Sequence, residues 1–421
     1  MTMSVREALA RVVDLFGPQT SWNPAQLYGN LMVSPNGNIL VGTLTDDGIH
    51  KLQVNGTTLL GGSGLVYPDG TAASSAQSNT NLIINGAALV QQSSAISVPA
   101  AGVLYGGVDR FKAINGATTG AFTQAAGTMT IGSVTKPCVI QTVTTVPTSL
   151  TGTNYWAGIL QVVEGYNAYH VLGQPLFASC YFYSNVSGTF TLAVRDSTGA
   201  NSFVSTFTAV AGTAVKVTIP LAAVPTSAVV PTTNGVGLQV TVGALSLGNY
   251  QVAPQTGWQA GNYFCASTAT NWSATIGNFI AVTELQLEVG TINTPFERHK
   301  YSEFLEQCQR YYQVITVQGL NGMTYTSNGD TRCTIPLHTK MRVAATGISC
   351  NETALNVIGF GVSSGSVCAL FTNVSMPIGS YQPSIDTLRI ASVSTTNLTA
   401  GGNTVIWSSS DTPTFYLSSE L

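Results

Sequence analysis

The chain is organised around one stretch of sequence, Thr294-Pro-Phe-Glu-Arg-His-Lys-Tyr-Ser-Glu-Phe-Leu-Glu-Gln-Cys-Gln-Arg-Tyr-Tyr312. Its apolar residues recur at the spacing of one helix face, at Tyr301, Phe304, Leu305, Cys308, Tyr311 and Tyr312. This spacing predicts an amphipathic helix of about three turns. Pro295 fixes where the stretch begins, because the residue before a proline disfavours helical backbone. The residues on both sides have the patterns of β-strands, so we expect residues 299–312 to be a helix that links two β domains.

Composition restricts the class of protein. Only 8% of the 421 residues are charged, whereas about 25% is typical of globular domains. No run of 18 or more apolar residues occurs, which argues against a membrane-spanning helix. Glu7 and Arg11 interrupt the N-terminal region, so we expect no signal peptide. A hydrophobic content of 44% argues against disorder, and an elongated, oligomeric all-β protein remains.

Charge and cysteine content predict neither a nucleic-acid interface nor a bound cofactor. The net charge is −3, and the 15 basic residues are scattered along the chain rather than clustered. The seven cysteines include no Cys-x-x-Cys pair, so we expect no metal site. We interpret them as buried free thiols of a protein made in a reducing cytoplasm.

Short motifs in and around the opening stretch carry a family resemblance. They are Glu288-Val-Gly, Thr294-Pro-Phe-Glu297 and Cys308-Gln-Arg-Tyr-Tyr312. Their order resembles the junction found in many bacteriophage tail-fibre and receptor-binding proteins. Separately, the segment at residues 37–56 is similar to segments of phage tail-fibre shafts and tailspike necks. The resemblance implies a jelly-roll domain like a carbohydrate-binding module, then the linking helix, then a C-terminal β-sandwich. It specifies no ligand.

Strand and turn patterns complete the domain prediction. Several short strand patterns before residue 109 are too small to bury a core alone, so we expect three chains to wind together there. The predicted fold class is an all-β, elongated homotrimeric fibre. Its expected parts are an attachment arm with a short helix at 1–30, a trimeric β shaft at 31–109, a jelly-roll sandwich at 110–298, the linking helix at 299–312 and a C-terminal β-sandwich at 313–421.

The N-terminal residues 4–16 have a second amphipathic pattern. The apolar positions of this predicted helix are Val5, Leu9, Val12, Val13 and Phe16. A helix this short is marginal in isolation. We therefore expect these residues to mediate oligomerisation around a threefold axis, or attachment to a phage tail or adaptor protein.

Sequence patterns for catalysis are weak. Glu284 and Glu288 fall on one face of a predicted strand but about 13 Å apart, which is a poor distance for a pair of catalytic carboxylates. The chain has no Gly-x-Ser-x-Gly motif, and its four histidines lie in four different regions. We therefore expect no enzyme activity.

Glycan binding requires fewer precisely placed residues than catalysis does. A sugar ring stacks on an exposed aromatic side chain, and its hydroxyls pair with amides and carboxylates. Aromatic residues in Gly-, Asn- and Thr-rich surroundings are the candidates for this role, and we name Tyr155, Trp156, Tyr166, Trp258 and Trp272. The alternative is that these side chains belong to the core, as tryptophans of sandwiches usually do.

Three hypotheses for function follow. The favoured one is a phage tail fibre that attaches the virion to a bacterial surface polysaccharide or outer-membrane receptor. It would be made in the host cytoplasm, act as part of the virion, and neither bind nucleic acid nor insert into a membrane. The first alternative is a head or neck fibre with no receptor role. The second is a tailspike depolymerase.

Overall fold

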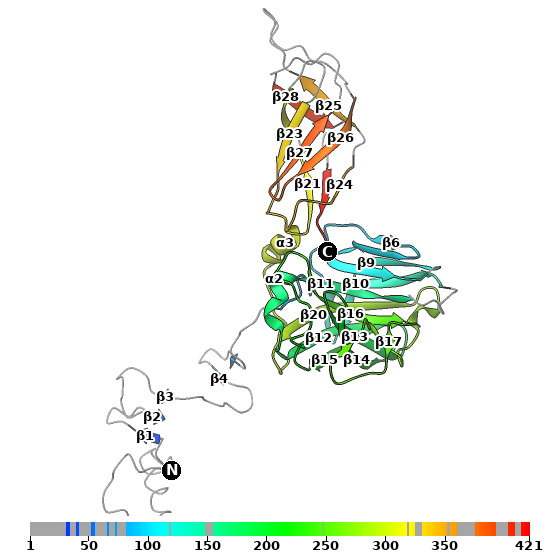
Figure 1. The fold of residues 1–421 in the computed structure, drawn as a ribbon, viewed down its shortest axis with the longest axis vertical. Coiled ribbons are helices and arrows are strands. Elements are labelled where there is room, and N and C mark those ends of the chain that lie inside the picture. The colour runs from blue at the N-terminus through cyan, green and yellow to red at the C-terminus, as the bar shows by residue number, and fades with distance from the viewer. Residues whose placement is uncertain are drawn as a thin grey trace, which may run out of the picture. The chain divides into compact units, whose positions relative to one another are not determined.

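Strands dominate the residues that the structure describes (Figure 1). The structure is a computed structural model, and it describes residues 81–117, 119–147, 155–246, 248–317, 320–324, 331–351, 354–359, 375–392, 403–408 and 414–421, with short strands before residue 74. The predicted all-β class is confirmed for these residues. The chain divides into two units, Met1–Ser78 and Asn79–Leu421.

The first unit is described at five short strands. β1 (Leu31–Val33) pairs antiparallel with β2 (Ile39–Val41), which pairs parallel with β3 (Leu52–Val54). β4 (Leu65–Val66) pairs antiparallel with β5 (Ala72–Ala73). The predicted helix with Val5, Leu9, Val12, Val13 and Phe16 lies outside the described residues.

The second unit begins with a sandwich of two sheets, residues 81–290. The six-stranded sheet has the order β15-β12-β20-β10-β9-β6, with bounds Val215–Leu221, Leu176–Ser184, Phe279–Val289, Val134–Thr145, Ala121–Ile131 and Ile96–Val98. The seven-stranded sheet has the order β18-β14-β13-β16-β11-β8-β7, with bounds Gln259–Ala260, Asn201–Ala209, Gly188–Asp196, Val236–Ser246, Trp156–Glu164, Val108–Asn115 and Gly102–Gly106. A parallel pair, β17 (Gln251–Val252) and β19 (Cys265–Ala266), follows β16. Short helical turns are α2 (Gly165–Ala168), η2 (Tyr169–Val171) and η3 (Trp272–Ala274).

The core of the sandwich lies between the two sheets. Successive side chains of a strand point to opposite faces, so every second residue enters the core. Phe182 of the six-stranded sheet and Phe190 of the seven-stranded sheet meet there, with ring centroids 4.6 Å apart. Full burial of each such ring stabilises the fold by about 1.5–3 kcal/mol.

The sandwich begins earlier in the chain than the sequence suggested, which corrects the predicted boundary at residue 110. Ile96–Val98 pairs with β9, and Val98 and Ile83 are buried in the core. Farther upstream, Leu82 donates a backbone hydrogen bond to the Leu287 carbonyl of β20. The short strand Ile96–Val98 gives no local indication that it belongs to the sandwich, because its partner β9 begins more than 20 residues later.

The predicted linking helix forms as α3 (Tyr301–Gln309), slightly shorter than residues 299–312. Phe304 and Cys308 are buried against Val90 of the sandwich. Tyr301, expected on the same apolar face, is exposed instead. The helix ends before Tyr312 because that residue begins the next strand.

The C-terminal part contains a closed barrel, where a β-sandwich was predicted for residues 313–421. β21 (Tyr312–Thr316), β29 (Thr414–Ser418) and β24 (Gly347–Cys350) form a three-stranded sheet. The barrel order is β22-β23-β27-β26-β25-β28, with bounds Leu320–Thr324, Thr331–Pro336, Thr387–Ser392, Ser375–Pro383, Ala354–Gly359 and Asn403–Ser408. Pairing of β22 with β28 closes the barrel and leaves no free sheet edge. Strand patterns alone do not separate a barrel from a sandwich, because both alternate with the same period.

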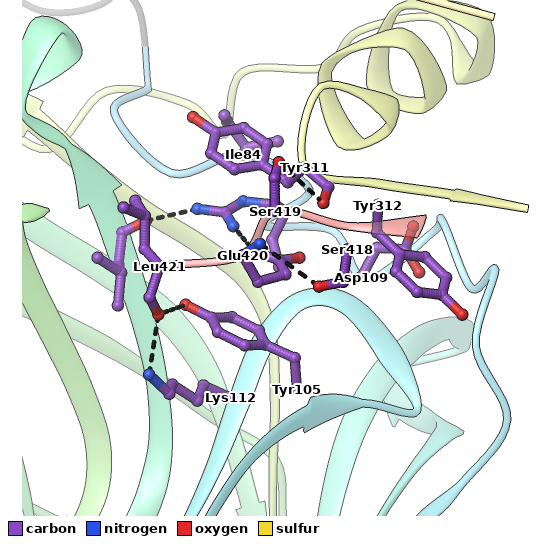
Figure 2. Close-up of polar contacts among 12 residues, drawn as sticks. Ile84, Tyr105, Asp109, Lys112, Tyr311, Tyr312, Ser418, Ser419, Glu420 and Leu421 are labelled. Atoms are coloured by element: carbon purple, nitrogen blue, oxygen red, sulfur yellow. Dashed lines mark hydrogen bonds and ion pairs between the residues drawn. The ribbon is translucent and has the colours of Figure 1, made fainter. Parts of the chain in front are cut away.

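The last residues of the chain return to the sandwich and join it through buried polar contacts (Figure 2). Glu420 forms an ion pair with Arg110, whose guanidinium lies 3.5 Å from the Tyr311 ring. The Leu421 carbonyl accepts hydrogen bonds from the Tyr105 hydroxyl at 2.7 Å and the Lys112 amine at 2.8 Å. Because Tyr311 directly follows α3, one cluster ties the linking helix, the C-terminal segment and the sandwich together.

Glu164 extends this cluster to the other side of Tyr311. Its carboxylate accepts a hydrogen bond from the Tyr311 hydroxyl at 2.6 Å and one from Arg310 at 2.9 Å. The Glu164 side chain is nearly fully buried, and these donors provide the hydrogen bonds that a buried carboxyl group needs.

Asp196 organises a turn at one end of the sandwich, where the sequence Asp196-Ser-Thr-Gly predicts one. Its carboxylate accepts hydrogen bonds from the backbone of Ala200 and Val229 and from the side chains of Thr198 and Asn201. Burial raises the pKa of Asp196, but the hydrogen bonds outweigh it and hold the pKa below its ordinary value of 3.8.

We expect Glu420→Gln to lower the free energy of unfolding by about 3–5 kcal/mol, because it leaves Arg110 buried without its counter-charge. The measurement is urea denaturation of the full chain. Glu306→Gln is the matched control, since Glu306 is exposed on α3; it should change the free energy by less than about 0.5 kcal/mol. Equal effects of the two substitutions would contradict a role for the Arg110–Glu420 pair in joining the domains.

We also expect Asp196→Asn to cost about 1–3 kcal/mol at neutral pH, because it disturbs a set of buried hydrogen bonds. A carboxyl whose native pKa is depressed stabilises the fold above its unfolded pKa, and loses that contribution as pH falls through the native pKa. The difference in the free energy of unfolding between wild type and variant should therefore decrease as the pH falls below 3.8. Urea denaturation at a series of pH values measures it, with Asp386→Asn in an exposed turn as control. A gap that stays constant with pH would be inconsistent with the depressed pKa.

Candidate functional site

Two of the five aromatic residues predicted to bind glycan lie in the core. Trp272 is fully buried, and its indole nitrogen donates to the Gly243 carbonyl at 3.0 Å. Tyr155 is 2% exposed, and its hydroxyl lies 2.8 Å from that of Ser273. The Asn271 side chain caps η3 and accepts a hydrogen bond from the Ser273 backbone. Trp272 and Tyr155 therefore have no surface to offer a ligand, and the core alternative holds for both.

Trp156 is partly exposed, but one face of its ring is occupied. The ring stacks on Phe264 with centroids 4.2 Å apart and an interplanar angle of 2°. The Arg195 guanidinium lies 3.5 Å from the Phe264 ring. Burial lowers the pKa of Arg195 to about 9. Trp156 thus belongs to a packed stack on the outer face of the seven-stranded sheet.

Trp258 and Tyr166 are the remaining predicted residues. Trp258 donates to the Ala222 carbonyl at 2.9 Å and packs edge-on against Phe203. Tyr166 on α2 is 53% exposed, and Tyr169 on η2 is 51% exposed. The five predicted residues therefore lie in separate environments and do not form one site.

A different group of aromatic residues gathers on the outer face of the six-stranded sheet. Tyr181 and Tyr183 of β12 are partly exposed, and the Tyr183 ring lies 5.4 Å from that of Phe279 on β20. Ala281 and Ile140 join them in one cluster. We call these five residues the aromatic face. They come from β12, β20 and β10, which are neighbours in the sheet (Figure 1).

Within the described residues, one member of this hydrophobic cluster lies outside the strands. Its members come from β9, β10, β12 and β20, with Ala214 just before β15. On the seven-stranded sheet, part of the outer face is covered by other segments: Leu421 packs on Leu160 and Val162, and Val252 and Tyr263 pack on Val204. On the six-stranded sheet, residues 294–298 cover the part of β20 from Glu284 to Glu288. The aromatic face is thus the outer sheet surface that the described chain leaves partly open.

Charged side chains border the aromatic face at Tyr181. The Lys216 amine lies 4.9 Å from the centre of the Tyr181 ring, and the Lys136 amine 5.4 Å from it. Contacts of this kind are attractive, because the face of an aromatic ring carries negative potential.

Glu284 is the carboxylate beside them, and a β-bulge sets its position. The register of β20 against β12 shifts between Ser179 and Tyr181, and Glu284 has a left-handed φ of 49°. Bulges of this kind redirect a side chain. The Glu284 carboxylate binds Lys136 at 2.7 Å and Arg298 at 2.5 Å.

Glu288, the other acidic residue considered for catalysis, has separate partners. It accepts hydrogen bonds from the Thr294 backbone at 3.0 Å and hydroxyl at 2.5 Å. Across the described ranges, no group of three or more His, Cys, Asp or Glu side chains is placed to bind a metal ion. Nor does any helix in that part of the chain have the length and apolar character needed to cross a membrane.

The sequence contains a signal for the aromatic face, in a stretch whose Phe and Tyr residues also predict a strand. In Leu176-Phe-Ala-Ser-Cys-Tyr-Phe-Tyr183, the two tyrosines alternate with Phe182 and must share one face. What the sequence does not show is which face enters the core, because apolar residues occur on both.

Comparison with known proteins assigns no family. No protein-family model and no curated protein sequence matches the chain. One similar solved structure is the N-terminal CBM22-1–GH10 part of xylanase 10B from Clostridium thermocellum, complexed with xylohexaose (11% identity, TM-score 0.23, 39% of this chain and 24% of that chain). Another is an exo-β-agarase (11%, 0.25, 45% and 24%), and a third is a putative sugar binding protein from Bacteroides thetaiotaomicron VPI-5482 (12%, 0.29, 50% and 100%). The chain spans about a quarter of the length of the first two. At these TM-scores, none of the three supports a functional assignment.

Proposed function

We propose that the chain is a bacteriophage tail-fibre protein that attaches the virion to a host-surface polysaccharide, and that the glycan binds at the aromatic face. The observation that carries the binding site is the partly exposed set of neighbouring rings at Tyr181, Tyr183 and Phe279. Aromatic rings of this kind offer flat apolar surface to the C–H faces of a sugar, and ordering them costs little entropy because they already pack on one another.

The fibre role is supported by the motifs of the linking stretch. Glu288-Val-Gly ends β20, Thr294-Pro-Phe-Glu297 leads to α3, and Cys308-Gln-Arg-Tyr-Tyr312 ends α3 and begins β21. These are the motifs that resemble phage tail-fibre junctions, and they lie between the sandwich and the C-terminal strands. A homotrimer attached to the tail through residues 1–30 would present three copies of the aromatic face, so that weak single sites combine into strong attachment.

We expect Tyr183→Ala to weaken binding of the full chain to host cells and to purified host polysaccharide by about tenfold, because it removes one stacking ring worth about 1–1.5 kcal/mol. Tyr166→Ala is the matched control, since it removes an equally large ring that is more exposed and lies outside the aromatic face. Binding isotherms give the affinities, and circular dichroism verifies that both variants are folded. If Tyr166→Ala lost binding and Tyr183→Ala did not, the glycan site would lie at α2 and not at the aromatic face.

The same purified polysaccharide separates the other roles. Release of reducing sugar on incubation with the chain would identify a depolymerase. Wild-type adsorption by particles that lack the second unit would identify a fibre with no receptor role. Either outcome would overturn the proposal.

A further inference from the structure

We propose that the aromatic face selects an acidic polysaccharide, one whose sugars carry a carboxylate, and that Lys216 and Lys136 bind this anion beside the stacked ring. The inference rests on the proposed function, because it names the class of glycan that the same face takes. It differs from the expectation of a neutral ligand that a chain with few charges would suggest.

The first support is where the two lysines come from. Lys216 lies on β15 and Lys136 on β10, and these strands flank β12 and β20 from opposite sides. Both amines nevertheless approach the ring of Tyr181. Because the amines lie over the Tyr181 ring, a sugar would stack on the neighbouring rings of Tyr183 and Phe279 and direct an anionic substituent toward the two amines.

The second support is an excess of positive charge. Arg298 and Lys136 both bind Glu284, so two cations share one carboxylate. Lys216 is exposed and has no carboxylate partner among the residues that the structure describes. Lys216, Lys136 and Arg298 therefore carry more positive charge than the one carboxylate, Glu284, that contacts two of them.

The third support is that Glu284 is held away from the ligand position. Its side chain is 5% exposed, and its Oε1 atom is bound by both cations. An incoming carboxylate would therefore meet the amines rather than an open negative charge. The bulge that places Glu284 keeps Lys136 positioned over Tyr181 while its charge remains only partly neutralised.

The pairing of rings with amines distinguishes the ligand from other occupants. A neutral glycan would use the rings of Tyr183 and Phe279, and Lys216 could offer its hydroxyls a hydrogen bond but no ionic attraction. A second copy of this chain would need an acidic patch to match, and the chain carries only 18 acidic residues. Charge complementarity therefore favours a carboxylated sugar.

The test begins with an array of neutral and carboxylated bacterial oligosaccharides probed with the full chain. The best carboxylated binder is then compared with its carboxyl-reduced form in binding isotherms at several NaCl concentrations. We expect carboxyl reduction to weaken binding about tenfold, and added salt to weaken only the binding of the native form.

Three lysine variants locate the effect. Lys216→Gln and Lys136→Gln should each weaken binding to the carboxylated glycan about two- to fivefold, because the interaction is with a partly exposed amine. In Lys136→Gln, Glu284 keeps Arg298 as its partner, so the fold is preserved. Lys340→Gln removes an equal charge from an exposed site outside the sheet and should leave binding unchanged. Lys216→Gln and Lys136→Gln should leave the affinity for the carboxyl-reduced glycan unchanged.

Two results would overturn the inference. Equal affinity for native and carboxyl-reduced glycan, with Tyr183→Ala still harmful, would leave the proposed function standing and remove the acidic preference. Binding of no glycan, together with a change in the light-scattering mass of Tyr183→Ala, would make the face an interface between copies of the chain and overturn both proposals.

Discussion

The two-faced geometry of a β-sheet is the constraint on which the rest of the structure depends. Side chains alternate along each strand, so a sandwich that buries one face of each sheet leaves two outer faces to be covered or exposed. The seven-stranded sheet has parts of its outer face covered by the chain itself, with Leu421 over Leu160 and the 250–266 segment over Val204. The six-stranded sheet keeps an open area, and that area holds the aromatic face. The position of the candidate site thus depends on which parts of the two outer faces are covered by other segments of the chain.

Coverage of the seven-stranded sheet also explains how the domains are joined. The segment that covers part of it is the end of the chain, held by the Arg110–Glu420 pair and by hydrogen bonds to the Leu421 carbonyl. This segment follows β29, which pairs with β21 directly after α3. One buried cluster therefore fixes the C-terminal strands and positions the sandwich, although its members lie more than 300 residues apart in the sequence.

Local patterns allowed much of the fold to be predicted. The strands at β12, β13, β15, β16 and β20, the turn at Asp196 and the linking helix all follow from alternation, turn residues and helical spacing. Long-range pairing was not accessible to the same reasoning. Ile96–Val98 is a strand because β9 supplies its partner, and the barrel exists because β22 meets β28 across some 80 residues. The local sequence of one strand does not indicate which distant strand will pair with it.

Prediction of the site failed for a related reason. Trp272 sits among small polar residues and was expected in a loop, yet a short capped turn directs its ring inward. Tyr181 and Tyr183 were identified only as strand residues, because Phe177 and Phe182 make both faces of β12 apolar. Which face is buried depends on the opposite sheet, and a single strand does not contain that information.

The most direct test of the account is a crystal structure of the full chain with a bound fragment of its host polysaccharide. The account predicts a sugar ring stacked on Tyr183 and Phe279, with an anionic substituent within hydrogen-bond distance of the Lys216 amine. A sugar bound at Tyr166 and Tyr169, or anywhere else away from the six-stranded sheet, would contradict it.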